Sequence, residues 1–231
     1  MESLNVPKHI AVIPARAGSK SIPNKNLIRI GNKRLIDYSI EAALKQKFFD
    51  RVLVTTDIED LLDTNYPDRV SSYRRGEALC SDDAFMVDVM RDVIISRNIS
   101  PKDYIWLLQP TTPFRRQEDF KSIHETLEKI GPQSLISVVT VGANHPNRMY
   151  TIKLDHLYPL RYTNFENKQE LMPSYIRNGA FYVFKVQSFM ERGTFYIKPC
   201  TSYVMPEINS INIDGPLEAF LANALAEAGK I

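Results

Sequence analysis

The sequence predicts an α/β protein whose core is an open, mostly parallel sheet. Several short apolar segments lack the polar alternation of half-exposed strands, which is typical of strands buried on both faces of a sheet. Most of them are followed by a stretch with apolar residues at helical spacing. Strands that alternate with helices favour a parallel sheet. The 231 residues, of which 44% are hydrophobic, suffice for one substantial domain, so we expect a single domain over residues 1–231.

Three units of strand, loop and helix are predicted in the first half of the chain. The segment from His9 to Pro14 is a continuous apolar run, and Ile36, Ile40 and Leu44 lie on one side of the helix predicted after it. A weak short helix is expected after Asp57. The predicted strands are 9–14, 51–56, roughly 69–72 and 104–108, and the main predicted helices are roughly 34–46, 86–94 and 117–129.

The second half of the chain begins with a predicted strand at 134–141 and then changes character. Residues from about 142 to 176 contain three prolines, several aromatic residues and short alternating stretches, which predict a β-hairpin excursion or a subunit arm. A core strand is expected to resume at Gly179. Pro216 is expected to open a final helix with Leu217, Phe220 and Leu221 on one face.

The composition argues against several classes of function. A net charge of +2 is too small for a nucleic-acid-binding surface, and the longest apolar runs are too short to cross a membrane. The first residues lack the order of a secretory signal, so we expect a cytoplasmic protein. Cys80 and Cys200 offer no disulfide framework, and the four histidines lack the spacing of a zinc site.

The loop after the first strand is the most informative segment for function. Ligands of open α/β sheets bind outside the carboxyl ends of the strands, where this loop lies. It places Arg16, Lys20 and Lys25 around Gly18 and Ser19, a combination that favours a phosphate site. The spacing is neither that of a P-loop nor that of a dinucleotide fingerprint. The alternative is a solvated basic loop.

A second polar segment, Gln109-Pro110-Thr111-Thr112-Pro113, follows the strand predicted at 104–108. Two prolines limit its backbone motion, so the amide of Gln109 can be fixed against a ligand. By itself this segment is more typical of a strand-ending turn than of a binding site. Arg75 precedes a small-residue stretch ending in Ser-Asp, but Arg74 is adjacent, so a solvated arginine pair is an alternative.

These segments, in this order, resemble the cytidylyltransferases that activate nonulosonic acids, with the 3-deoxy-manno-octulosonate enzymes as more distant relatives. The similar motifs are Arg-x-Gly-Ser-Lys with Lys-Asn after a four-residue spacer, Gln-Pro-Thr-Thr-Pro-Phe-Arg, Asn-Gly-Ala-Phe-Tyr and Ile-Asp-Gly-Pro-Leu-Glu. The resemblance covers nearly the whole chain. It implies a Rossmann-like nucleotidyltransferase domain of the nucleotide-diphospho-sugar transferase type, and a homodimer in which the β-rich insertion at 142–176 contacts the partner.

The resemblance also implies a role for individual residues. Arg16, Lys20, Lys25 and Asp214 would be catalytic. The nucleotide, CTP, would be bound by Ala15, Gly18, Ser19, Asn26, Arg75, Gln109, Pro110 and Thr111. The acid sugar would be bound by Gln109, Gln169, Tyr175, Arg177 and Asn178.

The last motif implies a Mg²⁺ site at Asp214 and Asn212. Alternation along a strand would place both side chains on one face, where two oxygen ligands can share a cation. Relatives usually carry aspartate at the position of Asn212, and many carry arginine at the position of Ile176. The alternative for Asp214 is a helix N-cap, because Pro216 follows two residues later.

The implied reaction is attack of the sugar's anomeric hydroxyl on the α-phosphate of CTP, giving a CMP-sugar and pyrophosphate. Catalysis would consist mostly of positioning and charge neutralisation. Two alternatives stay open. One is a nucleotidylyltransferase for another sugar or nucleotide, including 3-deoxy-octulosonate. The other is a non-catalytic nucleotide-sugar-binding relative, which the departures at Asn212 and Ile176 motivate.

Overall fold

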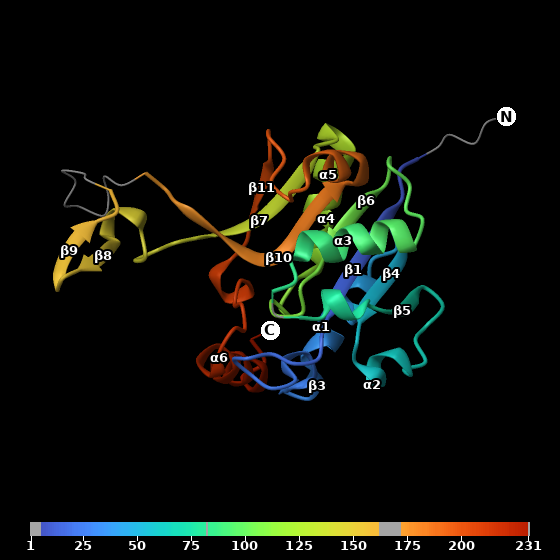
Figure 1. Ribbon diagram of the computed structural model, residues 1–231, viewed down its shortest axis with the longest axis horizontal. Helices are drawn as coiled ribbons and strands as arrows, with labels where there is room; N and C mark the ends of the chain where they lie inside the picture. Colours follow the sequence, from blue (N-terminus) through green and yellow to red (C-terminus); the bar gives the residue numbers. More distant parts are fainter. Residues whose placement is uncertain (1–5, 82, 162–171, 231) are drawn as a thin grey trace.

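The computed structural model describes residues 6–81, 83–161 and 172–230, and its centre is a seven-stranded sheet (Figure 1). The strand order is β11-β7-β10-β6-β1-β4-β5. Only β10 runs antiparallel to its neighbours, so the predicted mostly parallel sheet is confirmed. The strands are β1 (His9–Ala15), β4 (Phe49–Thr56), β5 (Val70–Arg74), β6 (Tyr104–Leu107), β7 (Ser134–Thr140), β10 (Tyr175–Lys185) and β11 (Thr201–Val204).

Helices cover both faces of the sheet, which explains why β1 is apolar without alternation. Ala11 and Ile13 pack with helices α1 (Leu35–Leu44) and α4 (Gln117–Ile130). Ile10 and Val12 point to the opposite face and pack with α3 (Met86–Ser96) and α5 (Val186–Arg192). Burial of the whole strand on both faces is typical of parallel sheets. The short α2 (Glu59–Leu62) follows β4.

A third, smaller core lies where α6 (Pro216–Glu227) packs beside the ribbon formed by β2 (Arg29–Ile30) and β3 (Lys33–Arg34). It contains Ile30, Leu35, Phe114, Ile213 and Ala222. The helix begins at Pro216, as predicted. Its apolar face does not enter this core, because Leu217 and Phe220 are 73% and 72% exposed. Among the described residues, the remaining short helices are 3₁₀ turns at Lys25–Leu27, Glu77–Leu79, Pro146–Arg148 and Glu207–Asn209.

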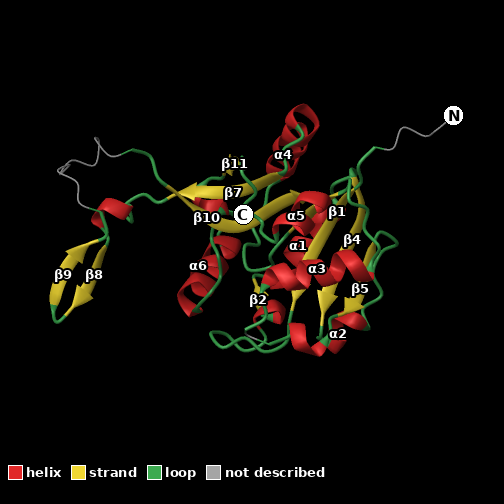
Figure 2. Cartoon of the chain, turned by 45° about the horizontal axis from the view of Figure 1, so that its top comes forward, coloured by secondary structure: helices red, strands yellow, loops and turns green. Residues whose placement is uncertain are grey.

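Residues 141–161, after β7, extend away from the sheet and carry a two-stranded hairpin of β8 (Tyr150–Lys153) and β9 (His156–Pro159) (Figures 1 and 2). A β-rich excursion was predicted here over 142–176. The prediction that the core strand resumes at Gly179 was wrong by four residues, because Tyr175–Arg177 already pair with Val138–Thr140. These first residues of β10 are exposed, so they lie outside the buried core that the strand enters after Arg177.

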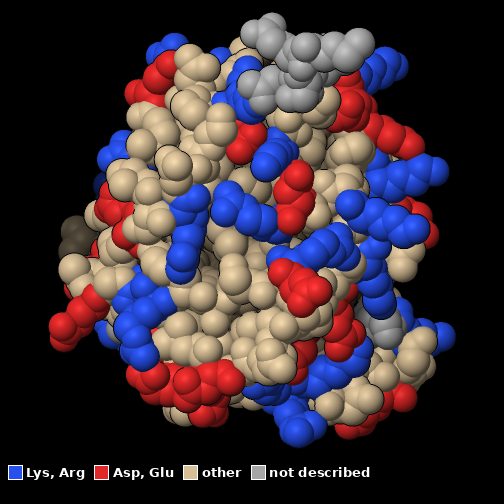
Figure 3. Space-filling view, turned by 90° about the vertical axis from the view of Figure 1, so that its right-hand side faces the viewer, with Lys and Arg blue, Asp and Glu red and all other residues tan. Residues whose placement is uncertain are grey.

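The surface carries both signs of charge. On the face shown in Figure 3, Lys and Arg side chains are interspersed with Asp and Glu side chains, in keeping with the small net charge. No helix among the described residues has the length and apolar character needed to cross a membrane.

Candidate active site

A cavity of about 180 Å³ opens where the loops after β1, β5 and β6 meet. Parallel strands place their carboxyl ends at the same edge, so these loops converge although they are far apart in the sequence. The cavity is lined by eight residues that the sequence analysis assigned to the nucleotide or to catalysis: Arg16, Ser19, Lys25, Asn26, Arg75, Gln109, Pro110 and Thr111. Pro14 and Met86 complete the lining.

The basic loop is folded back on itself and tied to the sheet. Gly18 has a φ of +65°, a conformation that glycine adopts without strain, and its carbonyl accepts a hydrogen bond from Arg16 Nη1. Asn26 Nδ2 donates to the carbonyl of Arg16 at 3.1 Å. The backbone N–H of Ala17 donates to Asp57 Oδ1 at 2.7 Å. These bonds give the loop a defined shape in the absence of a ligand.

Asp57 is a supporting residue that the sequence analysis did not assign. It directly follows β4, at the same edge of the sheet as the basic loop, so its position after a predicted strand was an available signal. Three of the predicted residues, Ala15, Gly18 and Lys20, belong to β1 or to the loop after it without lining the cavity. Lys20 is exposed, and Ala15 is buried at the end of β1.

Arg75 is a buried cation at the cavity. It is 4% exposed, its Nη2 donates to the carbonyl of Thr55 at 3.0 Å, and its buried Nε has no hydrogen-bond partner among the described residues. Burial lowers the pKa of Arg75 below the usual value for arginine. Arg74 points to the surface and pairs with Glu59 at 2.6 Å. The alternative of a solvated arginine pair is therefore wrong for Arg75, which is buried directly after the end of β5.

Arg115 fixes the loop after β6 through a hydrogen bond to its backbone. This arginine is 8% exposed and donates to the carbonyls of Gln109 at 2.7 Å and Ala180 at 2.8 Å, and to Ser39 Oγ at 2.9 Å. It therefore connects the loop to β10 and α1. The sequence motif contained Arg115, but its role was not predicted, because two of its three acceptors are backbone carbonyls that no side-chain pattern reveals.

Gly179 lets β10 pass close to this loop. Its φ is +79°, and a Cβ atom at this position would lie 2.9 Å from Gln109 Oε1 and 3.1 Å from Thr112 Oγ1. Thr112 is fully buried and donates to the carbonyl of Asn178 at 2.8 Å. The amide of Gln109 thus lies directly against the backbone of β10, in a space that any larger residue at position 179 would fill.

Residues 211–214 form an extended loop in the structure, so the expected strand at this position was wrong. A single backbone bond, from Ile213 N–H to the carbonyl of Thr111 at 2.7 Å, attaches the loop to the cavity wall. Asn212 and Asp214 nevertheless point toward each other, because Asn212 Nδ2 donates to Asp214 Oδ2. Lys25 Nζ lies 3.2 Å from Asp214 Oδ1 and also donates to the carbonyl of Ile213.

Asp214 does not cap the last helix, so that alternative was also wrong. The N-cap position of α6 is Gly215, whose N–H donates to Glu218 Oε2 at 2.8 Å. The Asp214 side chain stays 67% exposed beside Lys25. One carboxylate and one amide oxygen are hard donors of the type that Mg²⁺ uses when substrate phosphates and water complete its shell. The residues present therefore fit the implied Mg²⁺.

A second cluster with metal-binding side chains lies elsewhere, at His9, His124 and Glu128. The indole N–H of Trp106 donates to His9 Nδ1 at 3.0 Å. Since an indole nitrogen can only donate, the neutral His9 ring carries its proton on Nε2. His9 therefore has no lone pair to offer a metal. Burial, and then the neighbouring His124, lower the pKa of His9 from 6.5 to about 4, so the ring stays neutral at pH 7.

The structure does not bring together Tyr175, Arg177 and Asn178, the described residues that were predicted to bind only the sugar. Asn178 is buried, and its amide is bonded to Ser137 Oγ and Ser210 Oγ, so it supports the fold of β10 rather than facing the cavity. Arg177 points to the other side of the strand and lines a separate cavity with Ile136 and Val138. Tyr175 is half-exposed at the start of β10. Gln169 lies outside the described residues.

The family model described as cytidylyltransferase matches residues 10–197, and the chain belongs to this family. The chain is 31% identical over 227 residues to the N-acylneuraminate cytidylyltransferase of Escherichia coli O18:K1:H7, a match that covers 93% of this chain and 51% of that protein. It is 30% identical over 224 residues to the CMP-N,N'-diacetyllegionaminic acid synthase of Legionella pneumophila. This match covers 94% of this chain and 96% of that protein. The chain thus spans about half of the first relative and nearly all of the second.

Solved structures agree on the fold. A CMP:2-keto-3-deoxy-manno-octonic acid synthetase complexed with CTP superposes with a TM-score of 0.67 at 16% identity and covers 97% of this chain and 100% of its own. A 4-diphosphocytidyl-2C-methyl-D-erythritol synthase superposes with a TM-score of 0.65 at 12% identity, covering 96% of this chain and all of its own. The predicted Rossmann-like nucleotidyltransferase fold is confirmed.

Proposed function

We propose that the protein transfers CMP from CTP to the anomeric hydroxyl of a nonulosonic acid and releases pyrophosphate. The observation that carries this proposal is the convergence of Arg16, Lys25 and Arg75 with Gln109 on one cavity at the carboxyl ends of the strands. Its membership in the cytidylyltransferase family and the names of its relatives support the nucleotide and the class of sugar.

The cations of the cavity suit a triphosphate. Arg16 and Lys25 neutralise phosphate charge, and Lys20 adds a further positive charge on the same loop. Lys25 is held by Asp214 and the carbonyl of Ile213, so its ammonium group is already oriented before a ligand binds. The unpaired Nε of Arg75 supplies a buried donor for the nucleotide. Gln109 is fixed for contact with the nucleotide or the sugar.

In the proposed step, the anomeric oxygen forms a bond to the α-phosphorus of CTP while the bond from that phosphorus to the bridging oxygen breaks. Pyrophosphate leaves with the electron pair, and the hydroxyl proton passes to solvent. Arg16, Lys20 and Lys25 stabilise the charge of the leaving group. Asp214 and Asn212 would hold Mg²⁺, which when bound supplies further neutralisation of phosphate charge.

We also propose that the protein is a homodimer joined through the hairpin of β8 and β9. Every residue of this hairpin except Pro159 is exposed, and the exposed side chains include Ile152 and Leu157. A two-stranded hairpin with no core of its own is marginally stable in water, so a partner surface is expected to cover it. Because CTP is the co-substrate, we place the reaction in the cytoplasm.

The test is release of pyrophosphate from CTP and Mg²⁺ in the presence of N-acetylneuraminate, deaminated neuraminate, legionaminate, pseudaminate or 3-deoxy-octulosonate. Turnover with CTP and one of the first four acids is the expected result. Turnover with another nucleotide, or with 3-deoxy-octulosonate alone, would replace the proposed substrates. Binding of CTP without turnover of any acid would indicate the non-catalytic relative.

A further inference from the structure

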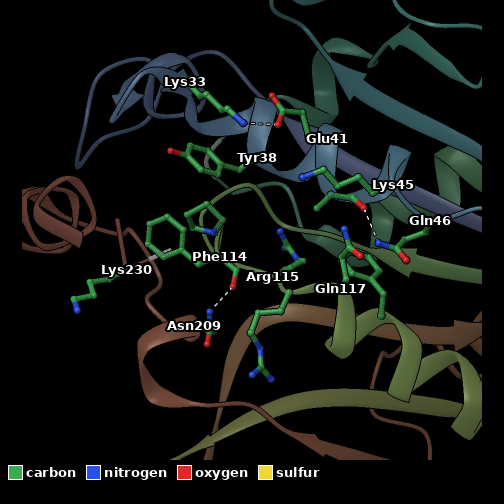
Figure 4. A pocket seen from close by; sticks show the side chains of 14 residues that line it. Lys33, Tyr38, Glu41, Lys45, Gln46, Phe114, Arg115, Gln117, Asn209 and Lys230 are labelled. Atoms are coloured by element: carbon green, nitrogen blue, oxygen red, sulfur yellow. Dashed lines mark hydrogen bonds and ion pairs between the residues drawn. The ribbon is translucent and has the colours of Figure 1, made fainter. Parts of the chain in front are cut away.

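A larger cavity, of about 420 Å³, lies between α1 and the segment that leads into α4 (Figure 4). Its lining includes Lys33, Tyr38, Lys45, Phe114 and Arg115. It shares no lining residue with the cavity at the ends of β1 and β6. Its volume falls within the range of small-molecule sites, and the proposed reaction assigns no role to it.

The lining is strongly basic. Five cationic side chains line this second cavity with one carboxylate, Glu41: Lys33, Lys45, Arg115, Arg116 and Lys230. Glu41 forms a salt bridge with Lys33, with 2.5 Å between Oε2 and Nζ. Arg116 forms one with Asp119, with 2.6 Å between Nη2 and Oδ1. Within the described part of the chain, Lys45 and Arg115 have no carboxylate within salt-bridge distance.

The positive charge of Arg115 lies in the protein interior. Its three hydrogen bonds go to uncharged acceptors and occupy three of its five N–H groups. The carboxylate that opposes the effect of burial on the pKa of Arg115 is Asp119, which already accepts hydrogen bonds from Arg116 and Tyr203. A buried cation without a paired anion is costly, and burial lowers the pKa of Arg115 to about 9.

We propose that this second cavity is a binding site for a small molecule with a phosphate or carboxylate group, neutralised by Lys45 and Arg115. The rings of Tyr38 and Phe114 meet edge to face at 5.8 Å and give the cavity an apolar wall for the rest of the ligand. Figure 4 shows the side chains of Lys45 and Arg115 on the same side of the cavity as Gln117. This inference stands apart from the proposed reaction.

The second cavity has a direct connection to the candidate active site. Arg115 lines the second cavity and donates to the carbonyl of Gln109, which lines the first one. An anion bound beside Arg115 therefore contacts the same side chain that donates a hydrogen bond to the loop after β6.

The test measures binding of radiolabelled inorganic phosphate to the full chain by equilibrium dialysis, without Mg²⁺ and with CTP added to occupy the candidate active site. Citrate is the carboxylate probe in a parallel series. We expect at least one probe to bind with a Kd of about 1 mM. Lys45→Gln is expected to weaken this binding at least about fivefold. Lys47→Gln, which removes the same charge from an exposed residue that does not line the cavity, is expected to leave it unchanged.

Two results would overturn the inference. Neither probe binds more tightly than about 10 mM, or the two lysine variants lose binding equally. The comparison of Lys45 with Lys47 needs no turnover, so its outcome is independent of whether the protein transfers CMP.

Discussion

Asn212 is the residue whose chemistry departs most from the implied metal site. It lies beside Asp214 and donates to that carboxylate, so the pair carries one negative charge and is further balanced by Lys25. Mg²⁺ is bound in proteins through one or two carboxylates together with substrate phosphates. A single carboxylate is sufficient for this mode of binding, but it attracts the cation less strongly than a pair of carboxylates does.

We expect Asn212→Asp to lower the Mg²⁺ concentration for half-maximal turnover by about threefold or more, because it adds a second charged oxygen ligand. The measurement is pyrophosphate release as a function of Mg²⁺ concentration. Asn98→Asp, which adds the same charge at an exposed residue after α3, is the control and is expected to leave the dependence unchanged. An unaltered Mg²⁺ dependence in Asn212→Asp would argue against a metal at this position.

His9 couples the stability of the core to pH. Its pKa is about 4 in the folded protein, because burial and His124 disfavour the charged ring, while the ordinary value is 6.5. Above pH 6.5 both the folded and the unfolded states are neutral. As the pH falls from 6.5 toward 4, the unfolded chain takes up a proton that the folded protein refuses, so stability decreases in this window.

We expect the wild-type protein to lose up to about 2 kcal/mol more unfolding free energy than His9→Gln between pH 7 and pH 5. Glutamine does not titrate, and its carbonyl can still accept the N–H of Trp106. Urea unfolding at the two pH values measures the difference. Parallel losses in both proteins would show that His9 does not carry this part of the pH dependence.

At the scale of elements, the loop after β6 and the middle of β10, residues 178–180, form one structural unit. Arg115, Thr112 and Gly179 hold them together through buried hydrogen bonds and close backbone packing. The sequence predicted both elements separately. Their contact could not be predicted, because β10 inserts antiparallel between β6 and β7, an order that no local periodicity specifies.

We expect Gly179→Ala to destabilise the protein by about 2–4 kcal/mol and to reduce turnover, because its Cβ enters the space of Gln109 and Thr112 at a positive φ. Gly131→Ala is the matched control. Gly131 also has a positive φ, of +59°, but nothing lies within 4 Å of its added Cβ. It is expected to cost about 1 kcal/mol and to leave turnover unchanged. Thermal unfolding and pyrophosphate release distinguish the two, and equal effects would contradict a special role for position 179.

At the scale of the whole molecule, the described part of the chain leaves the side chains of the β8–β9 hairpin exposed, apart from Pro159. Ile152 and Leu157 face each other across the hairpin and are 71% and 64% exposed. If this hairpin joins two subunits, charges at these positions will prevent association.

We expect the double variant Ile152→Lys, Leu157→Lys to sediment as a monomer at concentrations where the wild-type protein is a dimer, because it places two like charges in an apolar contact. Thr151→Lys, on the other face of the hairpin, is the control and is expected to remain a dimer. A wild-type monomer, or a variant that still dimerises, would contradict the proposed interface.

The parts of the fold and the site that the sequence predicts are those with a local signal. Buried parallel strands appear as continuous apolar runs, and their carboxyl ends identify the loops that carry Arg16, Lys25 and Gln109. Asp57 and Arg115 bind backbone groups of distant segments, so side-chain patterns do not reveal these partners, although the position of Asp57 directly after a predicted strand was an available signal. Arg177 was assigned to the sugar from a motif, whereas strand alternation points it to the opposite side.

The proposed attack of the sugar hydroxyl on the α-phosphate of CTP is tested most directly by following the anomeric oxygen through the reaction. A nonulosonic acid accepted in the pyrophosphate assay is equilibrated in ¹⁸O water, which labels its anomeric hydroxyl, and is then converted with CTP. Mass spectrometry of the CMP-sugar and of pyrophosphate locates the label. We expect the CMP-sugar to retain the labelled oxygen between sugar and phosphorus and pyrophosphate to be unlabelled. Loss of the label from the CMP-sugar would contradict attack of the sugar hydroxyl on the α-phosphate.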